Sequence, residues 1–143
     1  MTITPAAEEV IAAFKEVPDS AKLELLLEYA DALPELPERY STQPELFERV
    51  EECQSPVFLF TEVSREKVLV FLTAPVEAPT TRGFASILQV SLDGQSPERV
   101  LQFDDTFIEN LGVTALVSPL RIRGMHGMLN RIKRQVREKV NAL

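Results

Sequence analysis

The stretch VFLFTEVSREKVLVFLT, residues 57–73, decides the fold class of this chain. Its two ends, 57–63 and 67–73, are rich in β-branched and aromatic residues, and the polar connector Ser64-Arg65-Glu66 separates them. Two such runs joined by a short connector predict an antiparallel β-hairpin. Both faces of the second strand are largely apolar, so we expect cover on both sides of the sheet. One face would carry Val68, Val70 and Leu72, and the other Leu69, Phe71 and Thr73.

The residues before the hairpin have the pattern of helices separated by prolines. Apolar residues recur there at helical spacing, and polar or proline residues mark where each helix begins and ends. The expected segments are helices from Pro5 up to Pro18, from Asp19 to Leu33 and from Pro44 to Val50, with an extended stretch after Pro37.

The residues after the hairpin predict a proline-broken loop over 74–81, a turn at Asp93-Gly94, and further helices. The expected helices cover Arg82–Val90, a short segment from Ser96, a segment from Asp104 or Asp105 to Gly112, and a closing segment from Ser118-Pro119. The closing helix carries one apolar stripe, formed by Met125, Met128, Leu129, Ile132, Val136 and Val140. The fold class is therefore α+β, a small antiparallel sheet packed by helices.

The length and the charge bound the classes of function. A chain of 143 residues without a linker is expected to form a single domain over 1–143. The net charge of −7 argues against binding of nucleic acid or of an anionic membrane surface. The basic residues gather within 121–139, which suits docking onto a complementary protein surface, although a solvated cationic helix end gives the same pattern.

Nothing in the sequence suggests a membrane span or a secretory signal. A single cysteine makes no internal disulfide, so the expected location is the cytoplasm. One cysteine and one histidine do not make a zinc site, and the five glycines fit neither the dinucleotide nor the P-loop spacing. We therefore expect no metal and no cofactor in this chain.

Cys53, in the run VEECQSPVFLF (50–60), is the remaining candidate for chemistry. A lone intracellular cysteine is usually a small buried hydrophobic residue. However, Cys53 has polar neighbours and lies at the boundary of a strand, where loops carry reactive residues. The adjacent acids disfavour a thiolate, so a cation must come from elsewhere in the fold or from another protein. The candidates are Arg82, Arg121 and His126.

Four motifs in register resemble the SufE family. The run ECQS (52–55) before a strand resembles the family's Gly-Cys-Gln-Ser sulfur-acceptor loop. The other three motifs are LLLEYADALPELPERY (25–40), Arg82-Gly83-Phe84, and SPLRIRGM (118–125). The order and spacing of the four motifs agree with the family, and the resemblance covers roughly residues 6–138. The resemblance implies a two-layer fold like that of SufE and of the IscU-type scaffold.

The resemblance also implies a function. SufE-like proteins accept persulfide sulfur from a cysteine desulfurase of the SufS type, stimulate that enzyme, and pass the sulfur to iron–sulfur scaffold proteins. Pyridoxal phosphate belongs to the desulfurase and not to the acceptor. By this resemblance Cys53 is the acceptor thiol, Glu52, Gln54 and Ser55 form its loop, and Arg121 belongs to the matched Arg-x-x-Gly run. Arg82 is a second cation with a possible docking role.

Two positions depart from the family pattern. Glu52 stands where the family usually has glycine, so a loop that needs a positive backbone angle there would be strained. Ala74-Pro75-Val76 stands where an Ala-Asp-Ser-like run is common, so the usual acid is missing.

The predicted chemistry needs only one thiol. Cys53 would attack the outer sulfur of the donor persulfide, and a second thiol in the chain would reduce the product. We hypothesise that the 52–56 loop shelters Cys53 and swings outward on docking. Two alternatives remain: a binding module that activates the desulfurase without carrying sulfur, and a hydrolase-like pair formed by Cys53 and His126.

Overall fold

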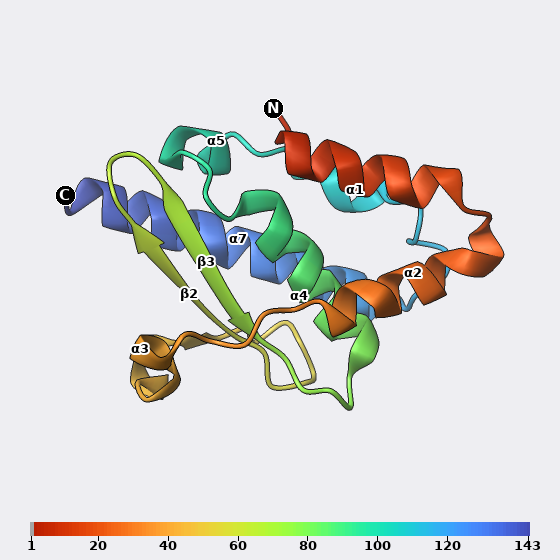
Figure 1. The fold of residues 1–143 in the computed structure, drawn as a ribbon, viewed down its shortest axis with the longest axis horizontal. Helices are drawn as coiled ribbons and strands as arrows, with labels where there is room; N and C mark the ends of the chain where they lie inside the picture. The colour runs from red at the N-terminus through yellow and green to blue at the C-terminus, as the bar shows by residue number, and fades with distance from the viewer. Residues whose placement is uncertain (1) are drawn as a thin grey trace.

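The computed structural model describes residues 2–143, and it contains the predicted hairpin (Figure 1). Strands β2 (Phe58–Val63) and β3 (Val68–Thr73) pair antiparallel, with Phe58 opposite Thr73 and Val63 opposite Val68. A short strand, β1 (Glu48–Arg49), pairs antiparallel with the other edge of β2, giving the sheet order β1-β2-β3. The α+β class predicted from the sequence is confirmed.

The helices surround this sheet. They are α1 (Pro5–Glu16), α2 (Asp19–Asp31), α3 (Glu38–Ser41), the 3-10 turn η1 (Pro44–Leu46), α4 (Pro79–Leu92), α5 (Pro97–Leu101), α6 (Phe107–Asn110) and α7 (Pro119–Asn141). Helix α4 occupies the centre, because residues 83–88 are all buried and the helix contacts α1, α2, α7 and β3. Helix α7 crosses behind the hairpin and packs on β2 (Figure 1).

Both faces of β3 are covered, as the sequence predicts. Val68, Val70 and Leu72 are buried in the main core, while the alternate residues are half-buried on the other face. There the ring of Tyr40 lies 4.9 Å from Phe71 and 5.1 Å from Phe60. The second face is therefore closed by aromatic side chains from the segment that contains α3.

Two local predictions before the hairpin are wrong, and after it α4 begins at Pro79, before the expected Arg82, while α6 covers only Phe107–Asn110, inside the limits of the expected segment. The residues after Pro37 form the short helix α3 instead of an extended stretch, because a proline restricts the residue before it and not those after it, and because Tyr40 packs onto the sheet. The helix expected from Pro44 to Val50 is a single 3-10 turn, after which Glu48 and Arg49 pair with Leu59 and Phe58. Pairing with an existing strand has overridden the local helical preference.

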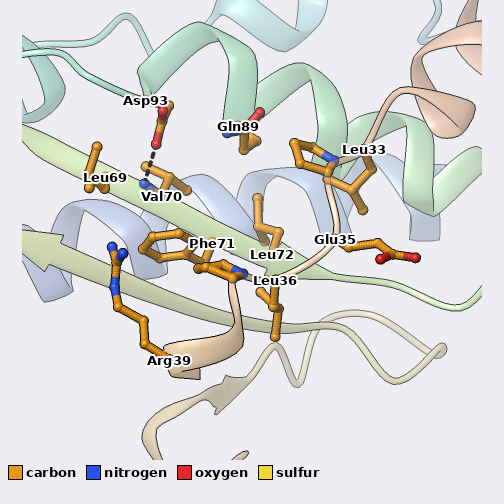
Figure 2. A pocket seen from close by; sticks show the side chains of 12 residues that line it. Leu33, Glu35, Leu36, Arg39, Leu69, Val70, Phe71, Leu72, Gln89 and Asp93 are labelled. Atoms are coloured by element: carbon orange, nitrogen blue, oxygen red, sulfur yellow. Dashed lines mark hydrogen bonds between the residues drawn. The ribbon is translucent and has the colours of Figure 1, made fainter. Parts of the chain in front are cut away.

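The outer edge of β3 is also closed. The amide of Val70 donates to the Asp93 carboxylate at 2.7 Å, and the amide of Val68 donates to the Gln95 carbonyl at 2.7 Å. Leu33 and Leu36, from the segment between α2 and α3, lie along the same edge and line a cavity of about 250 Å³ (Figure 2). Covering an edge in this way prevents pairing with a strand from another chain.

Candidate functional site

The loop between β1 and β2 places Cys53 against α7. The amide of Val50 donates to the carbonyl of Val57 at 2.9 Å, which closes the base of the loop. Inside the loop, the amide of Cys53 donates to the carbonyl of Val50 at 3.1 Å, and the amide of Val57 donates to the carbonyl of Ser55 at 2.9 Å. The loop is therefore compact and closed by backbone hydrogen bonds, with Cys53 near its middle.

The thiol of Cys53 packs on a glycine of α7. Cys53 is only 7% exposed, and a Cβ added to Gly124 would lie 2.9 Å from its Sγ atom. That distance is too short for real non-bonded atoms, so only glycine at 124 allows the sulfur to take this position. Gly124 is the glycine of the Arg-x-x-Gly part of SPLRIRGM, so the packing of the sulfur explains why this motif has a glycine here.

A cavity of about 150 Å³ opens beside the thiol. Gln54 and Ser55 line it from the loop, Thr81 from α4, and Ser118, Leu120 and Arg121 from the start of α7. A water molecule takes about 30 Å³ in the liquid, so there is room here for a further atom on the sulfur. Cys53, Gln54, Ser55 and Arg121, all named from the sequence, are thus brought together around one cavity.

Burial raises the pKa of the Cys53 thiol to about 11, and the negative charge of Glu52 acts in the same direction. The positive charges of Arg131 and Arg49 oppose this increase but do not cancel it. At neutral pH only about one thiol in ten thousand would be ionised at such a pKa. This closed arrangement therefore shelters Cys53 and favours its protonated form, which is the poorer nucleophile.

The three cations named from the sequence occupy different surroundings. Arg121 is exposed at the mouth of the cavity. The guanidinium of Arg82 is used inside the fold, where it donates to the carbonyls of Ala30 at 3.0 Å and Ala74 at 2.6 Å. His126 lies 2.7 Å from the carboxylate of Glu109 and does not line the Cys53 cavity. The structure does not bring His126 and Cys53 together as a pair.

Glu52 adopts an ordinary backbone conformation. Among residues 2–143, positive φ angles occur only at Gly94 and Gly112, so a glutamate at position 52 costs no backbone strain. Its side chain lies over Gly127, and its carboxylate accepts a hydrogen bond from Nε of Arg131 at 2.8 Å. That hydrogen bond lowers the pKa of Glu52 more than partial burial raises it.

Sequence reasoning missed the group that fixes the base of the loop. Partial burial would raise the pKa of Glu48, but hydrogen bonds from Gln135, Arg134 and Arg131 outweigh it and lower this pKa. Arg131 donates to Glu48 at 2.6 Å and Gln135 at 2.9 Å. The sequence did carry a sign of this contact with the loop: residues 124, 127, 131 and 135 recur at helical spacing and so share one side of α7.

The basic stretch of α7 is therefore mostly engaged within the molecule. Lys133 donates to Asp105 at 2.8 Å and to the carbonyl of Phe103, and Lys139 donates to the carbonyl of Thr61. Of the basic residues in this stretch, Arg121, Arg123 and Arg137 are exposed. Only this remainder is freely available to a partner.

The described part of the chain offers neither a metal-binding cluster nor a membrane-spanning helix. Over residues 2–143, no group of three or more histidine, cysteine or acidic side chains is arranged to hold a metal ion. No helix in that range combines the length and the apolar character needed to cross a membrane.

Comparisons with known proteins agree on one family. The model of the SufE family, described as an Fe-S metabolism associated domain, matches residues 8–136. An uncharacterised SufE-like protein of Mycobacterium tuberculosis is 50% identical over 131 residues, which cover 91% of this chain and 90% of the relative. The cysteine desulfuration protein SufE of Plasmodium falciparum is 26% identical over 137 residues, which cover 92% of this chain and 53% of that protein.

A solved structure has the same fold. The solution structure of a hypothetical protein from Thermus thermophilus matches with a TM-score of 0.84 and 36% sequence identity. The match covers 98% of this chain and 99% of that chain.

Proposed function

Because the chain belongs to the SufE family, whose domain is associated with iron–sulfur metabolism, we propose that it is a sulfur acceptor that uses Cys53. It would take persulfide sulfur from a cysteine desulfurase, stimulate that enzyme, and relay the sulfur to an iron–sulfur scaffold. One observation carries the proposal: the lone thiol of the described chain lies in a loop beside a cavity with room for one more sulfur atom.

The proposed transfer is a thiol–persulfide exchange. The thiolate of Cys53 attacks the outer sulfur of the donor persulfide, and a new S–S bond forms on Cys53. The S–S bond of the donor breaks at the same time, so the donor cysteine leaves as a thiolate. The Cys53 thiol loses its proton before the attack, which the closed loop disfavours because burial raises its pKa.

The side chains around the cavity suit a persulfide once it has formed. A persulfide ionises more readily than a thiol, so the product carries negative charge, and the cationic residue Arg121 lines the same cavity. Gln54 and Ser55 offer polar groups from the loop, and Leu120 offers an apolar wall. No cofactor of this chain is needed in the proposed step, since pyridoxal phosphate would belong to the desulfurase.

The test is the intact mass of the protein after incubation with a SufS-type desulfurase, cysteine and pyridoxal phosphate, followed by peptide mapping. We expect a gain of one sulfur atom on Cys53 that a reductant removes. A reaction without cysteine and a Cys53→Ser variant are the controls, and neither should gain sulfur. Failure to load Cys53 with several desulfurases that bind the chain would overturn the proposal.

The burial of Cys53 favours a second candidate, a docking module that activates the desulfurase without carrying sulfur. The rate of sulfide release by the desulfurase separates the two functions. A Cys53→Ser variant that stimulates the enzyme as fully as the unmodified chain supports the docking module. A variant that binds the enzyme but does not stimulate it supports the acceptor.

A further inference from the structure

The residue immediately before the thiol is attached to α7. A Cβ on Gly127 would lie 2.7–2.8 Å from Cβ, Cγ and Cδ of Glu52, so the Glu52 side chain fills the space that this glycine leaves. Beyond Gly127, the Glu52 carboxylate accepts a hydrogen bond from Arg131 at 2.8 Å. Glu52, Gly127 and Arg131 together are called the latch below.

The cationic member of the latch is itself held in place. Nη1 of Arg131 donates to the carboxylate of Glu48 at 2.6 Å, at the strand that begins the loop. The side chains of Arg131 and Glu52 are 22% and 30% exposed, so salt and water screen their interaction less than that of a surface pair. Arg131 thus joins the base of the loop to the residue next to the thiol.

Sulfur transfer requires the thiol to leave its present position. Cys53 is 7% exposed and its Sγ atom packs on Gly124, so little of the sulfur is open to the persulfide of another protein. Consecutive Cα atoms are about 3.8 Å apart, so an outward movement of the Cys53 backbone carries Glu52 with it. Such a movement removes Glu52 from Gly127 and separates it from Arg131.

We propose that Glu52 is a positioning residue that holds the acceptor loop closed through Gly127 and Arg131, and that these contacts break before Cys53 receives sulfur. The purpose of this latch rests on the proposed function. The latch itself is a property of the isolated chain, so it is measurable without any sulfur donor.

The test is the rate at which iodoacetamide alkylates Cys53 in the folded protein at constant pH, followed by intact mass. We expect Arg131→Met to react about five-fold faster or more, which corresponds to the loss of one partly buried ion pair. Electrostatics alone gives the opposite sign: the charge of Arg131 lowers the thiol pKa, so its removal from a loop that stays closed slows the reaction. A slower or unchanged rate overturns the latch.

A second variant guards against general loss of stability. Gly127→Ala places a methyl group where Glu52 now lies, yet alanine is the better helix former. We expect faster alkylation without a lower melting temperature, which only a local opening of the loop produces. Faster alkylation that scales with a lower melting temperature in both variants would instead indicate global unfolding and would overturn the proposal.

Matched controls and a double variant complete the test. Glu51→Gln removes one charge near Cys53. Glu51 is exposed and its contact with Arg49 is long, at 4.0 Å, so the alkylation rate should stay close to that of the unmodified chain. Arg137→Met removes an exposed charge of α7 and should also have little effect. Arg131→Met should speed alkylation in the unmodified chain but not in a Glu52→Gln background, where the pair is already broken. An equal acceleration in both backgrounds would show that the two residues act separately.

The latch and the proposed function can fail separately. If the variants leave alkylation unchanged but Cys53 still gains sulfur from a desulfurase, the latch is wrong and the acceptor stands. If the variants speed alkylation but no desulfurase loads Cys53, the latch stands and the acceptor fails.

Discussion

Gln135 of α7 accepts two hydrogen bonds from Thr61 of β2, one from its amide and one from its hydroxyl, both at 2.9 Å. Strand β1 is only two residues long and pairs with Phe58 and Leu59, so it does not reach the amide of Thr61. The side chain of Gln135 takes the place of the missing strand and continues to Glu48 at 2.9 Å. Helix α7 is therefore joined to the sheet at the base of the Cys53 loop.

Gln135→Met should destabilise the protein by about 2–3 kcal/mol, because it leaves the donors of fully buried Thr61 without a partner. Urea unfolding followed by circular dichroism measures the change. Gln102→Met is the matched control, since Gln102 is exposed on α5's C-terminal side and should change stability by less than about 0.5 kcal/mol. Equal effects of the two substitutions would contradict the role given to Gln135.

The thiol of Cys53 should titrate near pH 11 in the folded protein, against about 8.5 for an exposed thiol, because burial disfavours its charged form. A raised folded-state pKa adds stability below the unfolded-state pKa, and this stability is lost as the pH rises toward 11. The NMR shift of the Cys53 Cβ reports the titration. A midpoint near 8.5 in the folded chain would mean that the loop is open in solution.

Gly83→Ala should destabilise the protein by about 1–3 kcal/mol, which is the usual cost of overpacking. A Cβ at Gly83 would lie 2.5 Å from the backbone oxygen of Leu26, so α2 and α4 would have to separate. Gly127→Ala is the comparison, because the three atoms nearest to its new methyl group belong to the Glu52 side chain, which moves away when the loop opens. Thermal unfolding should therefore show a large decrease for Gly83→Ala and little or none for Gly127→Ala.

The contribution of Glu48 to stability should disappear in acid. Its pKa is lowered in the folded protein, so it adds stability above the unfolded-state value of about 4.3, and this is lost as the pH falls through the folded-state value. The difference in unfolding free energy between the unmodified chain and Glu48→Gln should be largest at neutral pH and shrink below about pH 4. A difference that does not change with pH would show that the carboxylate charge is not responsible.

The sequence predicted the elements whose signals are local. The hairpin follows from two β-rich runs around Ser64-Arg65-Glu66, and the starts of α5 and α7 follow from Ser96 and Ser118, which accept hydrogen bonds from Arg99 and Arg121. The SufE resemblance, carried by ECQS and three further motifs, is confirmed by the family model over residues 8–136. In each case the information lies within a few neighbouring residues.

Part of the candidate site was predictable for the same reason. Gln54 and Ser55 follow Cys53 directly in the chain, and Arg121 belongs to a recognisable motif, so sequence alone placed them near the site. Sequence alone could not decide the use of Arg82, because the carbonyls that it binds belong to Ala30 and Ala74, on other segments.

The sequence by itself therefore determined the α+β class, the family and the position of the thiol before β2, because periodicity and short motifs encode them locally. Only the tertiary structure decided that Cys53 is closed against Gly124, and that Glu52 lies over Gly127 and is paired with Arg131. Glu52 and Arg131 are 79 positions apart in the chain, and their contact depends on how α7 packs against the sheet. Contacts of this range follow from packing, which no local pattern records.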